Sequence, residues 1–491
     1  MKKDLKLSLI KVVGLTIGFG MQLIFTKVIG VKEYGVYVLF TTWTSLLSII
    51  LILGYDRLII KHLSFYYIQR KKEKFRSLLD KLILLILTNS LIFLILAFAL
   101  PQSFLTTLFF STDLIRSTWL LIAIGAVTFT LFDLFGKILS SMQRVELNYI
   151  RSEILYKFIL LITVIILFFN FYKLVGVNVI IVGVITSQLI TLLIFILFSE
   201  RKKISQYLKI EKEKESISKE NYVFFFSSLN YYFLTQIDKL FLGKYESLET
   251  LGVYGLVSTL VSIISFSTIV YQRFYPKISN YVNTNNINGL EIEFKTVTRN
   301  SLIIALPIMM FVIVFTNDIL SFFGERFTAG TDILRVLIWG QLTNFLTGPN
   351  GNVLNIGNRS KVDFINSIIV VALTTVLIFV GYKYYGVIGV ATATSFGLVL
   401  INLVKVVEVK LFYKIFPYEI KNICLTIAVF LAFFFVKSLH INISNIIINL
   451  IINFTLSLIA SFLFIGLLYT FFEKRYDYRV MFSRLLNRYG G

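Results

Sequence analysis

Long apolar segments separated by short polar connectors run through almost the whole chain. A helix that crosses the hydrocarbon core of a bilayer needs roughly 20 predominantly apolar residues. The segments lack the apolar–polar alternation of membrane-spanning strands, and backbone that faces lipid must satisfy its own hydrogen bonds, as a helix does. The pattern therefore predicts an all-α polytopic membrane protein with about fourteen transmembrane helices. These helices are expected at Ser8–Ile29, Gly35–Leu53, Leu78–Leu100, Ile115–Ser140, Ser152–Phe169, Leu174–Phe198, Asn221–Leu242, Val253–Gln272, Asn300–Thr316, Ile333–Ile356, Val362–Tyr382, Val387–Val404, Asn422–Val436 and Ile446–Phe472.

The composition agrees with a membrane protein and excludes several kinds of site. Hydrophobic residues make up 57% of the 491 positions and charged residues 15%, against roughly 25% charged residues in soluble domains. Cys424 is the single cysteine, so no disulfide forms within the chain. With only two histidines, no Cys/His cluster has metal-ligand spacing. No metal and no cofactor are expected.

The basic residues are distributed unequally between the connectors. The chain holds 48 lysines and arginines and 27 acidic residues, a net charge of +21. Connectors on one side of the membrane carry 34 of the basic residues, and those on the other side carry 6. Because basic connectors stay in the cytoplasm, both termini are expected to be cytoplasmic. The charge thus indicates topology and contact with anionic headgroups of the lipid bilayer, and no nucleic-acid partner is expected.

The chain also resembles itself at an offset of about 215 residues. The recurring segments are Tyr34-Gly35-Val36-Tyr37 with Leu251-Gly252-Val253-Tyr254, the set Gly136, Leu139, Arg144, Ile150 and Ser152 with Gly351, Leu354, Arg359, Ile365 and Ser367, and Tyr172-Lys173 with Tyr382-Lys383. Each copy holds six predicted helices, and parallel repeats of this kind form two bundles with a substrate site between them. We therefore expect an N-terminal bundle at residues 1–199, a cytoplasmic linker at 200–220, a C-terminal bundle at 221–410, and two additional helices with a basic tail at 411–491.

Charged side chains inside the predicted helices are costly and indicate partners or wet cavities. Asp133 and Lys137 stand four residues apart on one helix and are expected to form a structural ion pair. Lys11 begins a stripe of polar and small residues on the first helix, which either lines a cavity or packs against another helix. Asp238 in the seventh helix is the best candidate for a carboxylate that binds a proton or a cation, and a local pair with Lys239 is the alternative.

Two pairs of basic residues occupy equivalent positions after the second helix of each repeat. Arg57 and Lys61 are followed 216 residues later by Arg273 and Lys277. Arginine binds phosphate with two parallel hydrogen bonds and lysine adds a point charge. The four residues are therefore predicted to bind a diphosphate headgroup at the cytoplasmic mouth of the cleft, and simple positive-inside anchoring is the alternative.

The tenth predicted helix carries asparagines along one face. These residues are Asn344, Asn352 and Asn355, and Pro349 and Gly351 are expected to interrupt the helix. Irregular backbone at membrane depth is tolerated where it lines a cavity. The asparagines are therefore predicted to line the substrate cavity, with a kinked structural helix as the alternative.

Short motifs spread over nearly the whole chain carry a family resemblance. They are Ile29-Gly30-Val31-Lys32-Glu33-Tyr34-Gly35-Val36-Tyr37, Leu53-Gly54-Tyr55-Asp56-Arg57, Gln236-Ile237-Asp238-Lys239, Leu251-Gly252-Val253-Tyr254 and Gly386-Val387-Ile388-Gly389-Val390-Ala391. With them the chain resembles the polysaccharide biosynthesis proteins of the multidrug/oligosaccharidyl-lipid/polysaccharide (MOP) exporter superfamily, and in particular the Wzx-type O-antigen flippases.

This resemblance implies two six-helix bundles in a V shape that work by alternating access. It implies a cargo of oligosaccharide repeat units on undecaprenyl diphosphate, which are turned to the outer leaflet of the bacterial cytoplasmic membrane. It further implies that cationic residues of the cleft hold the diphosphate, a role that falls on Arg57 and, through the repeat, on Arg273. The family's aspartate in the seventh helix corresponds to Asp238, through which coupling to H⁺ or Na⁺ would run. The same role for Lys11 is our own inference from its position.

The expected function is therefore that of a flippase and not of an enzyme. The chain has no Gly-rich phosphate loop and, with two histidines, no plausible Ser/His/Asp arrangement. A drug/cation antiporter of the same superfamily is the alternative, although it would need cavity carboxylates where this chain has an excess of embedded bases. A membrane polysaccharide polymerase is a third hypothesis; it would need catalytic basic residues in a large outer loop, and Pro101–Leu114 contains none.

Overall fold

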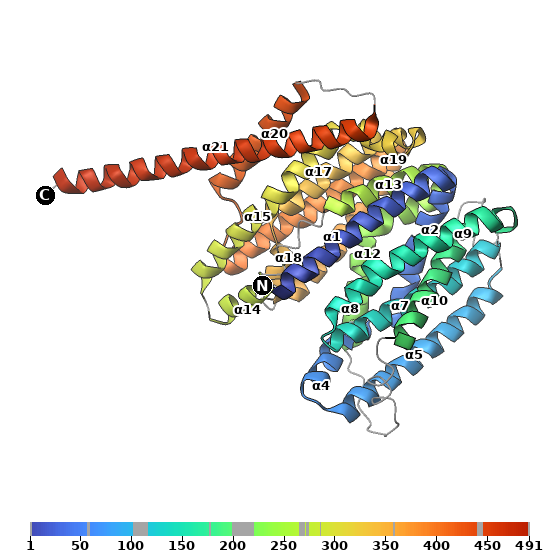
Figure 1. Cartoon of the computed structure of the whole chain (residues 1–491). Helices are drawn as coiled ribbons and strands as arrows, with labels where there is room; N and C mark the ends of the chain where they lie inside the picture. Colours follow the sequence, from blue (N-terminus) through green and yellow to red (C-terminus); the bar gives the residue numbers. More distant parts are fainter. Residues whose placement is uncertain are drawn as a thin grey trace. The chain divides into compact units, whose positions relative to one another are not determined.

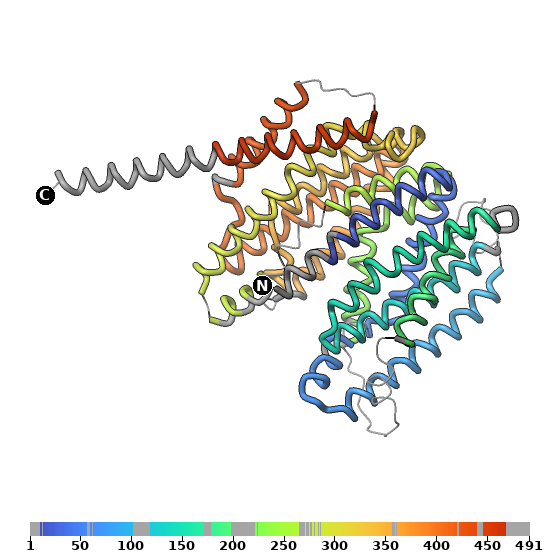
Figure 2. Tube along the Cα trace, viewed as in Figure 1, coloured from blue at the N-terminus to red at the C-terminus, as the bar shows by residue number. Residues whose placement is uncertain are grey.

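The apolar segments form helices throughout the part of the chain that the structure describes. The structure is a computed structural model (Figure 1), and its described residues contain no strand. Each of the fourteen predicted spans overlaps a helix, so the all-α membrane fold is confirmed. The described residues are 2–55, 59–101, 116–175, 178–198, 220–264, 271, 274–284, 286–356, 359–438 and 445–489 (Figure 2).

Eight helices in these ranges are long and apolar enough to cross a membrane, and three shorter apolar helices accompany them. The longest candidate, Lys361–Tyr413, has 53 residues. At 1.5 Å per residue it would measure about 80 Å, far more than the ~30 Å hydrocarbon core. Its backbone breaks at Gly386, where φ is 58° and ψ is −139°. The segment therefore consists of two consecutive helices, as the sequence predicts for this region.

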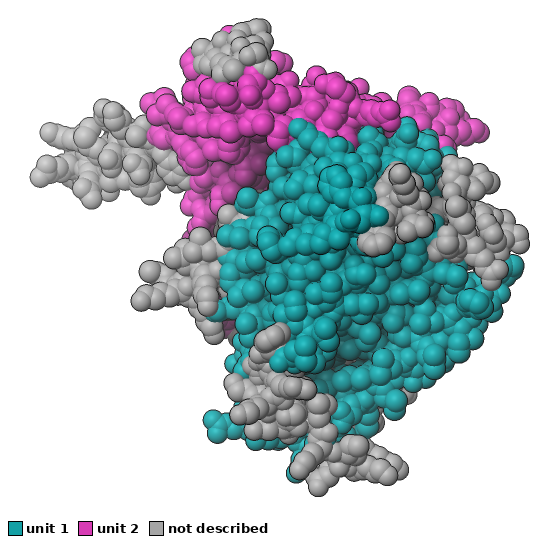
Figure 3. Space-filling view, turned by 45° about the vertical axis from the view of Figure 1, so that its right-hand side comes forward, with its two compact units in different colours: residues 1–256 teal, residues 257–491 magenta. Residues whose placement is uncertain are grey.

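The chain divides into two compact units, residues 1–256 and 257–491 (Figure 3). The first unit contains α1 (Lys2–Ile24), η1 (Phe25–Ile29), α2 (Val31–Ile52), η2 (Ile59–Leu63), α4 (Ser64–Ile68), α5 (Lys72–Ala99), α7 (Arg116–Ser141), α8 (Val145–Tyr149), η3 (Ile150–Leu155), α9 (Tyr156–Val175), α10 (Val179–Phe198), α12 (Glu220–Tyr245) and the first half of α13 (Leu248–Ile264). The second unit contains α14 (Tyr275–Asn283), α15 (Ile287–Val314), α16 (Thr316–Phe323), η6 (Glu325–Gly330), α17 (Thr331–Thr347), α18 (Asn350–Ile356), α19 (Ser360–Tyr413), α20 (Ile420–Ser438) and α21 (Ile446–Tyr489). The predicted linker lies outside the described residues, apart from its last position.

The hydrophobic cores of the two units use equivalent positions. The cluster in the first unit includes Phe75, Leu79, Leu82 and Ile138. The cluster in the second unit includes the residues that stand 215 positions later, namely Leu290, Phe294, Val297 and Val353. The repeat that the sequence reveals in short motifs therefore extends to the packing inside each unit.

Two glycines of the repeated motif let α2 and α13 approach each other at backbone distance. A Cβ added at Gly35 would lie 2.7 Å from the carbonyl carbon of Leu248 and closer still to its oxygen. A Cβ added at Gly252 would lie 3.1 Å from the backbone nitrogen of Gly35. Small residues commonly allow such close contacts between membrane helices. The two copies of the motif, Tyr34-Gly35-Val36-Tyr37 and Leu251-Gly252-Val253-Tyr254, thus pack against each other within the first unit.

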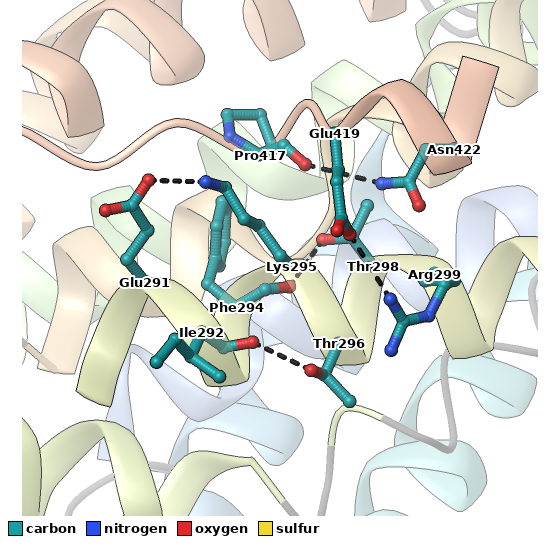
Figure 4. A network of polar contacts seen from close by, with 10 residues as sticks. All are labelled: Glu291, Ile292, Phe294, Lys295, Thr296, Thr298, Arg299, Pro417, Glu419 and Asn422. Atoms are coloured by element: carbon teal, nitrogen blue, oxygen red, sulfur yellow. Dashed lines mark hydrogen bonds and ion pairs between the residues drawn. The ribbon is translucent and has the colours of Figure 1, made fainter. Parts of the chain in front are cut away.

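The two C-terminal helices are attached to the second unit through α15, against which both α20 and α21 pack (Figure 1). Arg299 of α15 forms an ion pair with Glu419, just before α20, with Nη1 3.2 Å from Oε2 (Figure 4). On the same helix Lys295 pairs with Glu291 at 2.6 Å. Polar contacts therefore fix the start of α20 beside the N-terminal half of α15.

Candidate functional site

The four basic residues predicted to bind a diphosphate are described only in part. Arg57 and Arg273 lie outside the described residues, and so does the side chain of Lys61. Lys277 of α14 is exposed and forms an ion pair with Glu293 of α15, with 2.5 Å between Nζ and Oε1. Of the predicted set, only the side chain of Lys277 is placed, and it already has a carboxylate partner.

The polar stripe on α1 faces the segment formed by η3 and α9. The Nζ of Lys157 donates to the carbonyl of Gly14 at 2.9 Å and to Glu153 Oε2 at 2.7 Å. A Cβ at Gly14 would lie only 2.6 Å from the Cβ of Glu153. The ammonium of Lys11 lies 4.7 Å from the centre of the Tyr149 ring, within the range of a cation–π interaction. The stripe itself comprises Lys11, Gly18, Gln22 and Thr26. An added Cβ at its Gly18 would lie 3.1 Å from the Nζ of Lys157. At Lys11 and Gly18 the stripe therefore packs against another helix, and that contact includes charged side chains.

Asp238 is buried on α12, with 3% of its surface exposed. Its Oδ2 accepts a hydrogen bond from the hydroxyl of Tyr254 at 2.6 Å, and its Oδ1 accepts the backbone N–H of Lys239 at 2.8 Å. The ammonium of Lys239 donates to Gln236 Oε1 at 2.8 Å. Asp238 is thus a buried carboxylate held by the tyrosine that ends the repeated motif on α13.

A pocket of about 190 Å³ opens between α2, α7 and α12, all within the first unit. It is lined by two isoleucines of α2 and by Ser45, Ser48, Phe129, Asp133, Lys137 and Ser228. Asp133 and Lys137 form the predicted ion pair, with Oδ2 2.5 Å from Nζ, and their side chains are 38% and 21% exposed. Sequence reasoning assigned this pair a structural role and did not place it at a pocket. The serines that line the pocket with this pair lie on two other helices, α2 and α12. Their positions in the sequence do not indicate that they come together.

A second buried polar group surrounds Arg151 of η3, which is 2% exposed. Its guanidinium stacks 3.9 Å from the ring centre of Phe132 and donates from Nη2 to Asn148 Oδ1 at 2.9 Å. A Cβ at Gly136 would lie 2.6 Å from that same oxygen, so the glycine makes room for the polar pair. The sequence predicts a helix that begins at Ser152, one residue after Arg151, whereas the helical segment begins at Val145 and includes Arg151.

The equivalent positions of the second unit also hold buried polar groups. Asp363 and Asn366 stand 215 residues after Asn148 and Arg151. Asp363 Oδ1 lies 2.9 Å from Nζ of Lys405, and Asn366 donates to Glu408 Oε1. Both ion-pair partners are mostly buried, with side chains 14% and 18% exposed. This cluster was not predicted from the sequence, although Lys405 and Glu408 stand three residues apart on one helix face, a spacing that could have indicated it.

The three asparagines of the predicted tenth span do not share one continuous helix. The helix α17 ends at Thr347 and α18 begins at Asn350, and Gly348 between them has a φ of 72°. The predicted interruption is therefore present at Gly348 and Pro349, whereas Gly351 lies inside α18 and does not interrupt it. Asn344 and Asn352 are half-buried, and exposed Asn355 donates from Nδ2 to Asp363 Oδ2 at 3.2 Å. Asn355 thus contacts the cluster around Asp363 from its exposed side.

The sequence matches two known protein families and one curated relative. The family described as "Polysaccharide biosynthesis protein" matches residues 2–282, more than half of the chain. The family described as "MatE" matches residues 224–380. The teichuronic acid biosynthesis protein TuaB of Bacillus subtilis (strain 168) is 26% identical over 131 residues, which are 26% of this chain and 27% of TuaB. That alignment therefore spans only about a quarter of the relative's length.

Solved structures share the fold over most of the chain. The lipid II flippase MurJ, in an inward closed conformation, has a TM-score of 0.65 at 18% identity, with 95% of this chain and 98% of MurJ covered. A multidrug resistance MATE family transporter of the MOP superfamily, in an inward-facing conformation, has a TM-score of 0.61 at 15% identity, with 81% of this chain and 94% of that chain covered. At these identities the likeness shows the fold alone.

Proposed function

Because this chain belongs to the polysaccharide biosynthesis protein family, we propose that it is a lipid-linked oligosaccharide flippase. Its cargo would be the repeat unit of an O-antigen, a capsule or a related polysaccharide, carried on undecaprenyl diphosphate. By alternating access, the repeat unit would pass from the cytoplasmic to the outer leaflet of the bacterial cytoplasmic membrane, and both termini would remain cytoplasmic. The observation that carries the proposal is the pocket of the first unit, which is lined by charged and hydroxyl side chains of two candidate membrane spans, α2 and α7, and by Ser228 of α12. A hydrophilic cargo needs such polar lining at membrane depth.

In this proposal the diphosphate is bound by the cationic residues at the cytoplasmic end of each repeat. Arg57 and Arg273 would supply bidentate contacts, while Lys61, Lys277 and Lys11 would add point charges. The ion pair of Lys277 with Glu293 is exposed on the lysine side, at 52% of the side chain, and exposed pairs contribute only about 0–1 kcal/mol. A diphosphate would therefore displace the carboxylate at little cost.

The proposal assigns the sugar contacts of the second repeat to Asn344, Asn352 and Asn355, whose amides both donate and accept hydrogen bonds. It assigns coupling to an ion gradient to Asp238, since a buried intramembrane carboxylate is suited to bind H⁺ or Na⁺. If the assignment is correct, Asp238→Asn should remove the dependence of transport on the gradient. Transport that keeps the same dependence would exclude Asp238 from coupling.

The test is deletion of the gene followed by analysis of lipid-linked intermediates in spheroplasts. Loss of a flippase should leave complete repeat units on the inner leaflet, inaccessible to an added membrane-impermeant sugar-modifying enzyme. Complementation should fail with Arg57→Ala combined with Arg273→Ala. It should succeed with Lys72→Ala combined with Lys361→Ala, which removes the same charge from two exposed positions in connectors that are predicted to be cytoplasmic. Surface-exposed single units in the deletion strain would indicate a polymerase and contradict the proposal.

A drug/cation antiporter is the second candidate, and one observation favours it. The MatE match, residues 224–380, includes the buried carboxylate of Asp238, and a carboxylate suits a cationic drug. Altered dye efflux in the deletion strain, together with a normal surface polysaccharide, would support this function in place of the flippase.

A further inference from the structure

The pocket between α2, α7 and α12 combines an apolar wall with hydrogen-bonding groups. Phe129 and two isoleucines provide the apolar part, and three serines, one acid and one base provide the polar part. The Oγ of Ser45 donates to the carbonyl of Thr41 at 2.7 Å, which leaves its lone pairs as acceptors. With about 190 Å³, the pocket has room for about six water molecules at ~30 Å³ each, or for one sugar ring. Ligand sites typically join a mainly apolar lining to a few placed polar groups in this way.

The charges of the pocket cancel. Asp133 and Lys137 form an ion pair at 2.5 Å, and no other charged residue lines the pocket in the described part of the chain. A diphosphate entering here would gain the ammonium but would also meet the carboxylate, and like charges at short range repel. A neutral polyhydroxyl ligand avoids this conflict, because its hydroxyls can donate to Asp133 and accept from Lys137.

The repeat indicates that the ion pair is not required by the shared fold. The residues 215 positions after Asp133 and Lys137 are Gly348 and Asn352. At Gly348 the second unit has a break between two helices, whereas α7 of the first unit is continuous from Arg116 to Ser141. The core residues that precede and follow these positions in the sequence remain equivalent in the two units. The first unit therefore carries a charged pair at positions where the second unit has an interrupted helix and no charged side chain, and this favours a binding role for the pair.

We propose that this pocket binds one neutral sugar ring of the transported oligosaccharide, with the ring's C–H face on Phe129 and its hydroxyls on the serines and the Asp133–Lys137 pair. The inference rests on the proposed function and deepens it, since it separates a sugar site in the first unit from the cationic diphosphate site. Recognition of the first ring would make the pocket a determinant of which repeat unit is carried.

The test compares two lipids on the purified full-length protein in nanodiscs. The probes are undecaprenyl diphosphate and the same lipid with a single hexose or N-acetylhexosamine, and binding is measured by native mass spectrometry or microscale thermophoresis. Two or three net hydrogen bonds predict roughly tenfold tighter binding of at least one glycosylated lipid. Ser228→Leu, which fills the pocket, and Asp133→Asn combined with Lys137→Gln, which keeps it neutral, should each abolish this preference and leave binding of the bare lipid unchanged.

A matched control is available on α15, where Glu291 and Lys295 form an ion pair with the same spacing of four residues and do not line this pocket. Glu291→Gln combined with Lys295→Gln should keep the tenfold preference. Equal affinity of the wild type for the bare lipid and every glycosylated lipid would overturn the sugar site and leave the flippase proposal standing. Weaker binding of the bare lipid by the pocket variants would also overturn it, because the pocket would then hold the diphosphate. Binding of neither kind of lipid would overturn the proposed function and this inference with it.

Discussion

The contact between Gly35 and Gly252 allows a quantitative prediction about stability. Alanine at Gly35 would place a Cβ 2.7 Å from the carbonyl carbon of Leu248, whereas real Cβ atoms do not approach closer than about 3.0 Å. Because the obstacle is backbone, no side chain can rotate away, and the two helices must separate. Overpacking of this kind costs about 1–3 kcal/mol, and we expect the upper end of that range. Alanine also raises helix propensity over glycine by about 1 kcal/mol, which partly masks the clash.

A second glycine isolates the clash from the helix propensity. At Gly20 of α1 an added Cβ would meet nothing within 4 Å, so Gly20→Ala keeps the propensity gain and has no clash. The difference in unfolding free energy between Gly35→Ala and Gly20→Ala should therefore be about 3 kcal/mol, measured by reversible unfolding in mixed micelles. Gly252→Ala should lower the unfolding free energy about as much as Gly35→Ala. The double variant should lose less stability than the two single variants together, because one separation of the helices relieves both clashes. Equal stability of Gly20→Ala and Gly35→Ala, or strict additivity of the pair, would refute the backbone contact.

Three further predictions concern polar contacts within one unit each. Tyr254→Phe removes the hydroxyl donor of a buried carboxylate and should lower the unfolding free energy by about 1–3 kcal/mol; an unchanged melting temperature in detergent would show that the bond is not needed. Lys405→Met leaves Asp363 buried without its counter-ion and should lower the unfolding free energy by about 3–5 kcal/mol. The double variant Lys405→Met with Asp363→Leu should recover most of that loss, and a double variant less stable than the single one would contradict this. The ion pair of Arg299 with Glu419 is partly exposed, so a double-mutant cycle of alanine variants should give a coupling of only about 0.2–1 kcal/mol that weakens in high salt.

The positions of the helices could be predicted from the sequence because the apolar runs are long and rarely interrupted. Their ends could not be predicted as well. The ninth span was expected to begin at Asn300, yet α15 begins at Ile287. The additional turns contain the Glu291–Lys295 pair, which stabilises a helix outside the hydrocarbon core where hydropathy gives no signal. The same reason explains why α5 begins at Lys72 and not at Leu78.

The candidate site could be predicted only where its parts lie close together in the sequence. The Asp133–Lys137 pair follows from a spacing of four residues on one helix, and the structure confirms it. The pocket beside it requires α2 and α12 to converge on α7 and places Ser228 within reach of residues nearly a hundred positions earlier. No local pattern contains that information. The hydrogen bond from the Tyr254 hydroxyl to Asp238 could not be predicted either, because the two residues lie on different helices. The sequence shows Tyr254 only as part of the repeated motif.

The two copies of the repeat differ at several buried polar and charged side chains. Four apolar core positions recur as apolar residues, since an apolar side chain packs equally well in either unit. At the polar positions a cation, Arg151, corresponds to the neutral Asn366, while the neutral Asn148 corresponds to an anion, Asp363. A buried charge without a partner costs several kcal/mol, so each exchange needs a compensation within its own unit. In the first unit Arg151 is accommodated by aromatic faces and an amide, and in the second the charge of Asp363 is balanced by Lys405 from the other half of α19. The scaffold is thus common to both units, whereas the charges are arranged separately in each, and it is in these differences that the substrate and coupling residues of the chain should be sought.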